Sequence, residues 1–552
     1  MSKNIKTWDG SKQLFGLHYD LHANARDTEL GVCATPENLE HELARLGLDF
    51  AQTDCKGHPG MTSWFSKTPD ATVCPGLKKD LMVQWREATS RLGIPLHCHY
   101  SGIWDAAAAK RRPEWAVVPY EQRDTLLKDA GKIQKMCPRS GYIDELLIPQ
   151  FKELIDRYNV DGFWIDGDMW AVEPCYCPRC LDSWEKQTGS RDAPASPADS
   201  GWSEWMLFIR RSFEDYVRHY CDVVHEYKPG IRICSNWLQT FANPGNPDVP
   251  TDWISGDNSC IWGLDRGRCE ARFLPNRGKQ WDIMIWAFYS THGLARPTSA
   301  WTVKSAQMLQ QEAAIFMSTG GSVQIYENGV MRDGRLIPWR IGRIVEVAEF
   351  IKDRIELCEG TETIPQIAVL HSEHHLYTTA TGTNLMWDFN YAPVRGSVAG
   401  LLENHYGVDI FDEWALSTRV GEFPVVVVPE QSKISDKMVA RLQDYVKNGG
   451  KLLLTGAELI KRFPADFIGA EISETRENAT LYVPVGKDIA AIHSPVWAML
   501  KSSTAEDYAP LGSTFMPGEF MTGFPGFTLN RVGKGAVGCI PCNLFQDFHN
   551  NP

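Results

Sequence analysis

Short apolar runs alternate with amphipathic stretches between residues 15 and 355. This alternation is typical of parallel strands joined by crossover helices. Eight strands over about 340 residues predict a (β/α)8 barrel, with a doubly wound sheet as the alternative. The eight runs that we expect to form strands are residues 15–23, 48–55, 94–101, 160–168, 231–237, 251–258, 280–288 and 321–328.

The pattern restarts near residue 361 with a second set of strands and helices. Residues 425–428 are fully apolar and residues 451–454 are apolar after Lys451, as buried parallel strands are. After residue 460 the chain is richer in Gly, Pro and aromatic residues and contains short strand-like runs. The sequence therefore predicts a barrel over residues 1–360, a smaller α/β domain over 361–460 and a β-rich region over 461–552.

Each predicted barrel strand ends in residues that a hydrophobic core would reject. The carboxyl ends of barrel strands meet on one face, where catalysis is placed. Eight successive polar endings therefore predict a functional site on that face. The residues concerned are His18, Asp20, Asp54, His58, His99, Tyr100, Asp166, Asp168, Asn236, Trp237, Asp257, Trp286 and Glu327.

The strongest local signal is the segment VDGFWIDGDMW, in which Asp166 ends an apolar strand and a glycine follows. A carboxylate in that position is costly unless it has a task. A retaining glycosidase needs one carboxylate that attacks the anomeric carbon and a second that protonates the leaving oxygen. We therefore expect Asp166 to be a catalytic nucleophile; the alternatives are a helix cap or a cation ligand.

Several segments, in order over residues 14–290, resemble the retaining α-L-fucosidases of glycoside hydrolase family 29. FGLHYD resembles their GIFIHWG, KGHPGMTSWFSKTPD their KHHEGFTNWPS, and LHCHYS their GLYHS. YNVDGFWIDGD resembles their YKPDLIWFDG, in which the Asp is the nucleophile, and RFLPNRGKQWDIMIWAFY resembles RPWETCMTINDSWGY. The resemblance implies an α-L-fucosidase-like activity with Asp166 as the nucleophile, and a sugar pocket lined by His18, His58, Trp64, Tyr100 and Trp164. The polar strand ends add four further candidates for binding the sugar: His99, Asp168, Asn236 and Trp286.

The acid/base has no matching motif in the chain. Asp257, at the end of the sixth predicted strand, is the first choice. Glu270 on the following loop and Glu327 at the end of the eighth strand are alternatives. Asp168 is expected to orient Asp166 or to bind a hydroxyl group of the sugar.

A second signal is CYCPRC, which places Cys175, Cys177 and Cys180 together, with Cys137 upstream. Four thiolates satisfy tetrahedral zinc and leave no open position, so the metal would be structural. The pattern resembles the zinc cluster of family 42 β-galactosidases, whose acid/base position is held here by Asp166 and whose nucleophile has no counterpart. Buried or oxidised cysteines without a metal are the alternative.

The smaller α/β domain resembles the trimerisation domain of those β-galactosidases and the flavodoxin-like amidotransferase fold. The resemblance implies a homo-oligomer, a dimer or trimer. No cofactor is expected for catalysis. A β-galactosidase or α-L-galactosidase and a non-catalytic carbohydrate-binding barrel remain alternatives, as does a metal-dependent hydrolase using His97 and His99.

Net charge and composition limit the classes of molecule that the protein is expected to bind. A net charge of −13 argues against nucleic acid and anionic membranes and suits a neutral glycoside substrate. No apolar run is long enough to span a bilayer. The first residues, MSKNIKTWDGSKQ, have no apolar segment of a secretory signal. We therefore expect a cytoplasmic protein, or a periplasmic or secreted one if a signal has been removed.

Overall fold

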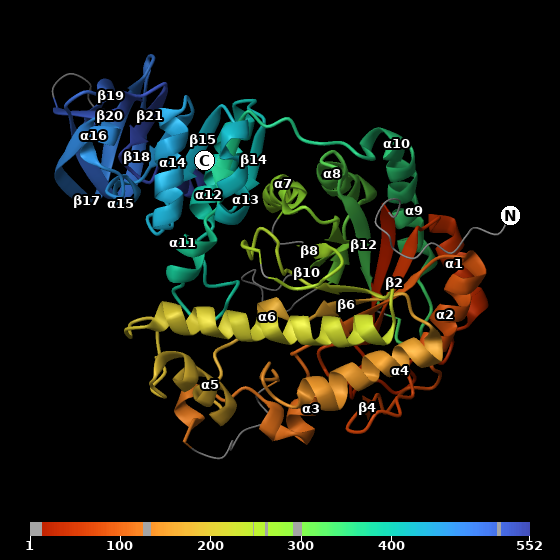
Figure 1. Cartoon of the computed structure of the whole chain (residues 1–552). Helices are drawn as coiled ribbons and strands as arrows, with labels where there is room; N and C mark the ends of the chain where they lie inside the picture. Colours follow the sequence, from red (N-terminus) through yellow and green to blue (C-terminus); the bar gives the residue numbers. More distant parts are fainter. Residues whose placement is uncertain are drawn as a thin grey trace. The chain divides into compact units, whose positions relative to one another are not determined.

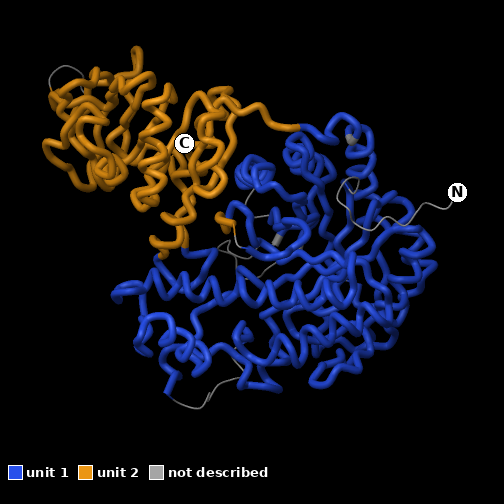
Figure 2. The backbone as a smooth tube through the Cα atoms, in the orientation of Figure 1, with its two compact units in different colours: residues 1–242, 247–361, 381–388 blue, residues 243–246, 362–380, 389–552 orange. Residues whose placement is uncertain are grey.

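The computed structural model describes residues 14–124, 134–246, 248–259, 263–290, 301–329, 331–515 and 520–551. The chain forms two compact units (Figure 2). Unit 1 comprises residues 1–242, 247–361 and 381–388, and unit 2 comprises residues 243–246, 362–380 and 389–552. Among the described residues, no helix combines the length and apolar character needed to cross a membrane.

Unit 1 is the expected barrel. Its eight parallel strands follow one another around the sheet in chain order, with β1 between β2 and β12. Seven strands lie within the runs that the sequence pattern predicts, and β2 extends one residue beyond its run, to Lys56, so the barrel is confirmed. The strands are β1 (Phe15–Asp20), β2 (Phe50–Lys56), β5 (Leu96–Ser101), β6 (Gly162–Asp166), β7 (Arg232–Ser235), β8 (Ile254–Asn258), β9 (Trp281–Trp286) and β12 (Ser322–Asn328).

Two backbone hydrogen bonds close the sheet between β7 and β8. The Asp252 amide donates to the Ile233 carbonyl at 2.8 Å, and the Trp237 amide donates to the Ser255 carbonyl at 3.0 Å. The Asp252 carboxylate also accepts from the Ile233 amide at 2.7 Å. The seam is thus held at both ends of β7, and the strand ends form a complete ring.

Helices cover the outside of the barrel (Figure 1). The first, α1, shows why they form where they do: Thr35 accepts a hydrogen bond from the Asn38 amide, Pro36 occupies the first turn, and Gly47 ends the helix at φ 58°. The connection from β7 to β8 has no helix among its described residues, 236–246 and 248–253. The main helices are α1 (Pro36–Leu46), α2 (Leu81–Leu92), α4 (Ile148–Tyr158), α6 (Trp202–Tyr227), α7 (Gly263–Phe273), α8 (Ala306–Met317) and α9 (Pro338–Lys352).

Shorter elements decorate the loops of unit 1. The two small strands β3 and β4 extend the sheet beside β2, and β10 pairs with β11 in a separate ribbon. They are β3 (Met61–Thr62), β4 (Thr72–Val73), α3 (Ala106–Arg111), α5 (Pro178–Thr188), β10 (Phe288–Ser290), β11 (Trp301–Val303) and α10 (Ile355–Cys358).

Unit 2 begins as a flavodoxin-like sheet. Its five parallel strands lie in the order β14-β13-β15-β16-β21, which is the 2-1-3-4-5 order of that fold. The strands are β13 (Ile367–Leu370), β14 (Val408–Phe411), β15 (Val425–Pro429), β16 (Lys451–Thr455) and β21 (Gly535–Ile540). The helices are α11 (Glu373–Thr378), α12 (Ala392–Glu403), α13 (Glu413–Arg419), α14 (Asp436–Lys447), α15 (Ala457–Ile460), α16 (Ala465–Ile468) and α17 (Leu544–Asn550).

The β-rich region expected after residue 460 continues the same sheet. The long antiparallel strands β17 (Ala470–Val485), β18 (Asp488–Ser502), β19 (Glu506–Gly512) and β20 (Met521–Val532) follow β21 in the order β21-β20-β19-β17-β18. Because β21 pairs with both β16 and β20, the expected boundary at residue 461 corresponds to a change from parallel to antiparallel pairing within one nine-stranded sheet.

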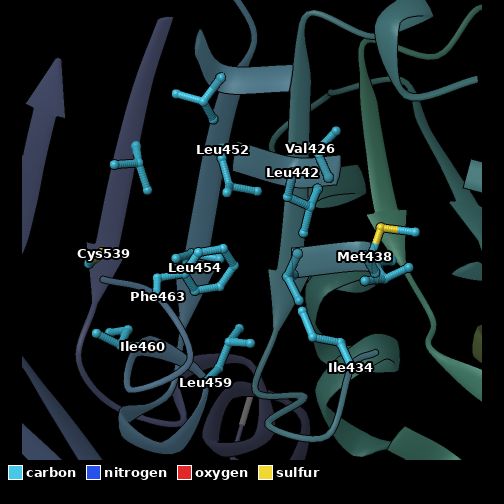
Figure 3. Close-up of a cluster of buried hydrophobic side chains, with 14 of the residues drawn as sticks. Val426, Ile434, Met438, Leu442, Leu452, Leu454, Leu459, Ile460, Phe463 and Cys539 are labelled. Carbon is cyan, nitrogen blue, oxygen red and sulfur yellow. The ribbon is translucent and has the colours of Figure 1, made fainter. Parts of the chain in front are cut away.

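The parallel half of unit 2 packs around a continuous apolar core (Figure 3). Val426 of β15 lies beside Leu442 of α14, Leu454 of β16 lies beside Phe463, and the side chains of Val426, Leu442 and Leu454 are fully buried. Because β15 and β16 lie inside the parallel half of the sheet, their central residues are apolar, whereas Lys451 at the start of β16 is exposed.

We expect Leu454→Ala to destabilise unit 2 by about 2–5 kcal/mol, because the truncation leaves a cavity in a core that cannot fully collapse. Denaturant unfolding followed by circular dichroism measures the change. Ile364→Ala is the control: that side chain is 91% exposed, so its removal changes stability by less than about 0.5 kcal/mol. Equal effects from both variants would contradict this account of the core.

Candidate active site

A pocket of about 310 Å³ lies among the carboxyl ends of the barrel strands. Imidazoles and carboxylates share its wall with indole rings, which suits a small ring that carries hydroxyl groups on one side and C–H bonds on the other. The lining residues are His18, Asp20, His22, His58, His99, Asp166, Trp170, Trp237, Asp257, Ser259, Met284, Trp286, Tyr326 and Trp387.

Asp166 ends β6 and is held by four side chains. Its Oδ2 atom lies 3.3 Å from Nε2 of both His58 and His99. Its Oδ1 atom accepts hydrogen bonds from Trp170 Nε1 at 2.8 Å and from Asn236 Nδ2 at 2.9 Å. Burial alone would raise the pKa of Asp166, but the two imidazoles hold it well below its usual range. Asp166 is therefore ionised.

The glycine after Asp166 gives the loop its sharp turn. Gly167 has φ 57°, and a side chain there would meet Ser101 Oγ at 2.8 Å and Trp104 Cβ at 2.9 Å. The turn leads into the 3-10 helix Met169–Ala171, which carries Trp170 back to the carboxylate. The motif IDGDMW thus folds so that the Trp170 indole donates a hydrogen bond to Asp166.

Asp257 lies in β8, and its pKa is shifted in the opposite direction from that of Asp166. Its Oδ2 atom accepts from Asn236 Nδ2 at 2.9 Å, and its Oδ1 atom accepts from Trp286 Nε1 at 3.1 Å. Burial, together with the negative charge of Asp166, raises the pKa of Asp257 to about 7. Asp257 can therefore hold a proton near neutral pH while Asp166 holds none.

Asn236 fixes the spacing of the two carboxyl groups. The same nitrogen lies 2.9 Å from one oxygen of Asp166 and 2.9 Å from one oxygen of Asp257, so these two oxygens are at most twice that distance apart. The carboxyl groups of inverting glycosidases stand roughly 6.5–9.5 Å apart, and those of retaining enzymes about 5–5.5 Å. The bound on these two oxygens admits the separation that retaining enzymes have.

A chain of imidazoles and carboxylates continues from Asp166. His99 Nδ1 lies 2.9 Å from Asp54 Oδ1, and His22 Nε2 lies 2.9 Å from Asp20 Oδ2. Although burial would lower them, the pKa of His99 is well above its usual value and that of His22 is raised, because these carboxylates surround them. The floor of the pocket therefore contains alternating charges that can donate to or accept from hydroxyl groups.

His18 and Trp164 complete the floor. The His18 side chain is fully buried, with Nδ1 2.5 Å from Gln52 Nε2, and burial lowers its pKa. The Trp164 ring lies beneath, with its centre 5.6 Å from the centres of both His18 and His99. Tyr326 donates to Asp20 at 2.9 Å on the other side.

The structure brings most of the predicted site residues together. His18, His58, His99, Asp166, Asp257 and Trp286 line the pocket. Asn236 joins the two carboxylates, and Trp164 supports the floor.

Trp64 and Tyr100 are fully buried and do not line the pocket. Tyr100 follows His99 in β5 and therefore points to the other side of the strand, where its hydroxyl donates to Gln150. His97, in the layer below His99, packs against Phe50 and Trp253, and burial lowers its pKa to about 4. The metal-ligating pair of His97 and His99 does not form in the pocket.

Three carboxylates expected at the site have structural partners instead. Glu327 is paired with Arg340 and Arg343 at 2.7 and 2.9 Å, because its strand neighbour Tyr326 takes the pocket side. The other two, Asp168 and Glu270, are also buried outside the pocket lining.

Asp168 accepts from the Ile103 amide, Ser235 and Tyr220, and burial raises its pKa to about 8. It holds the turn after β5 and is not among the residues that line the pocket. Glu270 accepts from the Phe241 amide at 3.0 Å, and burial raises its pKa to about 7.

Six residues of the lining were not predicted. The alternation of side chains along a strand could have indicated Tyr326 instead of Glu327. His22 and Trp170 could have been predicted because each is close in sequence to an aspartate already assigned to the site. Trp387 lies beyond the barrel sequence, and no local pattern marks it. The six are His22, Trp170, Ser259, Met284, Tyr326 and Trp387.

The four predicted cysteines do gather. The Sγ atoms of Cys137, Cys175, Cys177 and Cys180 all lie within 4.8 Å of one another and are buried. Cys137 Sγ is 3.5 Å from Cys180 Sγ and 3.8 Å from Cys177 Sγ. Zinc–sulfur bonds of 2.3 Å in a tetrahedron give sulfur–sulfur separations of about 3.8 Å. The cluster therefore has the size and the donor set that a structural metal requires.

Comparison with known proteins agrees with this geometry. Residues 35–230 match the α-L-fucosidase family. This segment runs from α1 to α6 and includes Asp166, His58 and His99. The match confirms the resemblance inferred from the strand-end motifs and supports a glycosidase. No curated protein sequence matches the chain.

Solved structures share the fold at low sequence identity. α-L-Fucosidase isoenzyme 2 from Paenibacillus thiaminolyticus aligns with a TM-score of 0.77 and 18% identity over 98% of this chain and 81% of that one. β-Galactosidase from Bacillus circulans sp. alkalophilus gives 0.71 and 16% over 98% and 88%. An exo-β-1,4-mannosidase from Opitutaceae bacterium strain TAV5 gives 0.60 and 13% over 98% and 93%. The shared architecture extends through both units.

Proposed function

We propose that this protein is a retaining exo-glycosidase that acts on α-L-fucosides, with Asp166 as the nucleophile and Asp257 as the acid/base. The observation that carries the proposal is the pair itself. One carboxylate has a lowered pKa, the other has a pKa raised to about 7, and a single Asn236 nitrogen links them. Opposed pKa values in neighbouring carboxyl groups assign the base and the acid of such a reaction.

In the first step, Asp166 attacks the anomeric carbon while Asp257 gives its proton to the glycosidic oxygen. The C–O bond to the leaving group breaks, the alcohol departs, and a glycosyl ester with Asp166 forms. Trp170 and Asn236 hold Oδ1, and His58 and His99 lie beside Oδ2, so the nucleophile is oriented before substrate arrives.

In the second step, Asp257 is ionised and takes a proton from water, whose oxygen attacks the anomeric carbon. The ester bond breaks and Asp166 leaves as a carboxylate, which restores the starting state with net retention. As the Asp166 charge is consumed in the ester, the pKa of Asp257 falls, because that charge is one cause of its elevation. The acid of the first step thereby becomes the base of the second.

The match of residues 35–230 to the α-L-fucosidase family supports fucose as the sugar. The β-galactosidase alternative has its own support in the cysteine cluster and in the fold shared with β-galactosidases. The lowered pKa of Asp166 favours the first assignment, because an acid/base in the β-galactosidase position would have to hold a proton.

We expect Asp166→Ala to lower hydrolysis of 4-nitrophenyl α-L-fucoside by at least about 10³-fold, or ~4 kcal/mol of barrier. Added azide should fill the space of the lost carboxylate and give a glycosyl azide of inverted configuration. Asp265→Ala is the matched control, since its side chain is 65% exposed on α7. Cleavage of a β-galactoside, with an azide product of retained configuration, would instead make Asp166 the acid/base.

The pH dependence of kcat/KM should show a basic limb near pH 7. Asp257 must be protonated to act as the acid, so activity is present below its pKa of about 7 and is lost as the pH rises through it. Asp257→Asn should abolish this limb and slow substrates with poor leaving groups most. Glu270→Gln is the control, because Glu270 has a similar pKa but lies outside the pocket lining. A basic limb that disappears in the Glu270 variant would refute the assignment.

We also propose that the four-cysteine cluster holds a structural zinc ion. Zinc there would pin the loop that follows Asp166 to the segment around Cys137, and all four thiolates would be used, so it takes no part in the reaction. A dimer or trimer and the cellular compartment stay predictions.

Metal analysis should find about one zinc per chain. Cys177→Ser, or a strong chelator, should lower the melting temperature by at least about 5 °C, because the metal binds the folded chain. Cys33→Ser serves as the control, since Cys33 is exposed and outside the cluster. Metal-free protein with reduced thiols and an unchanged melting temperature would exclude the ion.

A further inference from the structure

Segment 381–388 belongs to the compact unit of the barrel although it interrupts the sequence of unit 2 (Figure 2). It is a closed loop. The Thr381 hydroxyl donates to the Asp388 carbonyl at 3.1 Å, and the Asp388 carboxylate accepts from the Asn384 amide at 2.8 Å. Gly382 allows this closure, because a Cβ atom there would clash with the Asp388 carboxylate.

The loop is anchored to the turn that carries Trp170. Asn384 Nδ2 donates to the Trp170 carbonyl at 3.0 Å, and Asn384 Oδ1 accepts from the Met386 and Trp387 amides at 2.8 and 2.9 Å. Leu385 and Met386 are buried. One asparagine therefore ties the backbone before Trp387 to the turn whose indole contacts Asp166.

Trp387 stands at the mouth of the pocket. The floor residues His18 and His99 are fully buried, Asp166 is half-buried, and Trp387 is 48% exposed, more than any other described residue of the lining. A sugar that reaches the floor with its anomeric carbon at Asp166 points its leaving group outward. The leaving group then lies between Asp166 and the solvent, where Trp387 is.

We propose that Trp387 is the platform of a leaving-group subsite that binds a sugar ring through its apolar face. The inference rests on the proposed glycosidase function and specifies which glycosides it uses: those whose aglycone is itself a ring, rather than a short alkyl chain. An indole on a loop held by buried anchors offers a flat apolar surface with little further loss of conformational freedom.

The test compares substrates that differ only in the leaving group. α-L-Fucosyl fluoride has no ring to stack, whereas a fucosyl disaccharide has one. Trp387→Ala should lower kcat/KM for the disaccharide about tenfold, chiefly through KM, and leave the fluoride within about twofold. Trp387→Phe should restore most of the loss. Trp339→Ala, which removes an indole that is 61% exposed on α9 and outside the pocket lining, should change neither substrate.

The outcomes separate the two proposals. If the wild-type protein does not hydrolyse the fluoride, the proposed function fails and this inference fails with it. If the fluoride is hydrolysed but Trp387→Ala affects both substrates equally, or neither, the function stands and the platform is refuted.

Asn384 provides a second variant that spares the indole. Asn384→Asp keeps the oxygen that accepts from the Met386 and Trp387 amides but loses the donor to the Trp170 carbonyl. The selective loss on the disaccharide should reappear at smaller size. An equal loss on the fluoride would show that the loop supports Trp170 and the nucleophile instead, and would overturn the assignment.

Discussion

The site depends on one constraint: a carboxylate must stay ionised in a buried pocket while a second, a few ångströms away, keeps its proton. Burying an isolated charge is costly, so Asp166 needs partners. It has four, and one of them, His99, is held as a cation by Asp54 and Asp20 as well as by Asp166. The same charge on Asp166 raises the pKa of Asp257. The pKa values of the two carboxyl groups are thus linked, since burial and the negative charge of Asp166 together raise the pKa of Asp257.

This electrostatic arrangement requires a closed barrel. The partners of Asp166 come from β5, from the loop after β2, from the turn after β6 and from the residue after β7. Asn236, which links the two carboxylates, stands at the seam between β7 and β8, beside the hydrogen bond from Trp237 to Ser255. The spacing between Asp166 and Asp257 is therefore set where the sheet closes. In an open sheet of the same strands, β7 and β8 would be opposite edges and Asp257 would have no contact with Asn236.

The positions of the barrel strands and of Asp166 and Asp257 could be predicted from the sequence. Each strand is an apolar run, and each of the two carboxylates stands at the polar end of such a run. The sequence was insufficient where one residue decides which side of a strand faces the pocket. Tyr100 and Glu327 were expected in the site, yet their neighbours His99 and Tyr326 line it. The change to antiparallel pairing within one sheet of unit 2 was missed as well, since β21 joins β16 across about 80 residues of sequence, a long-range pairing with no local signature.

Trp387 is the lining residue that the local sequence pattern was least able to predict. Every other lining residue lies in or near a barrel strand end, where the fold itself delivers it to the pocket. Trp387 lies in a loop outside the barrel sequence. Asn384 connects the backbone of this loop to the Trp170 carbonyl. The floor residues bond to one another, so changing one disturbs the charge balance of the rest. In the loop, Asn384 bonds to the Met386 and Trp387 amides and to the Trp170 carbonyl. The proposed leaving-group platform and the proposed catalytic pair therefore lie on separate segments of the chain, which are linked through Asn384 and the turn that carries Trp170.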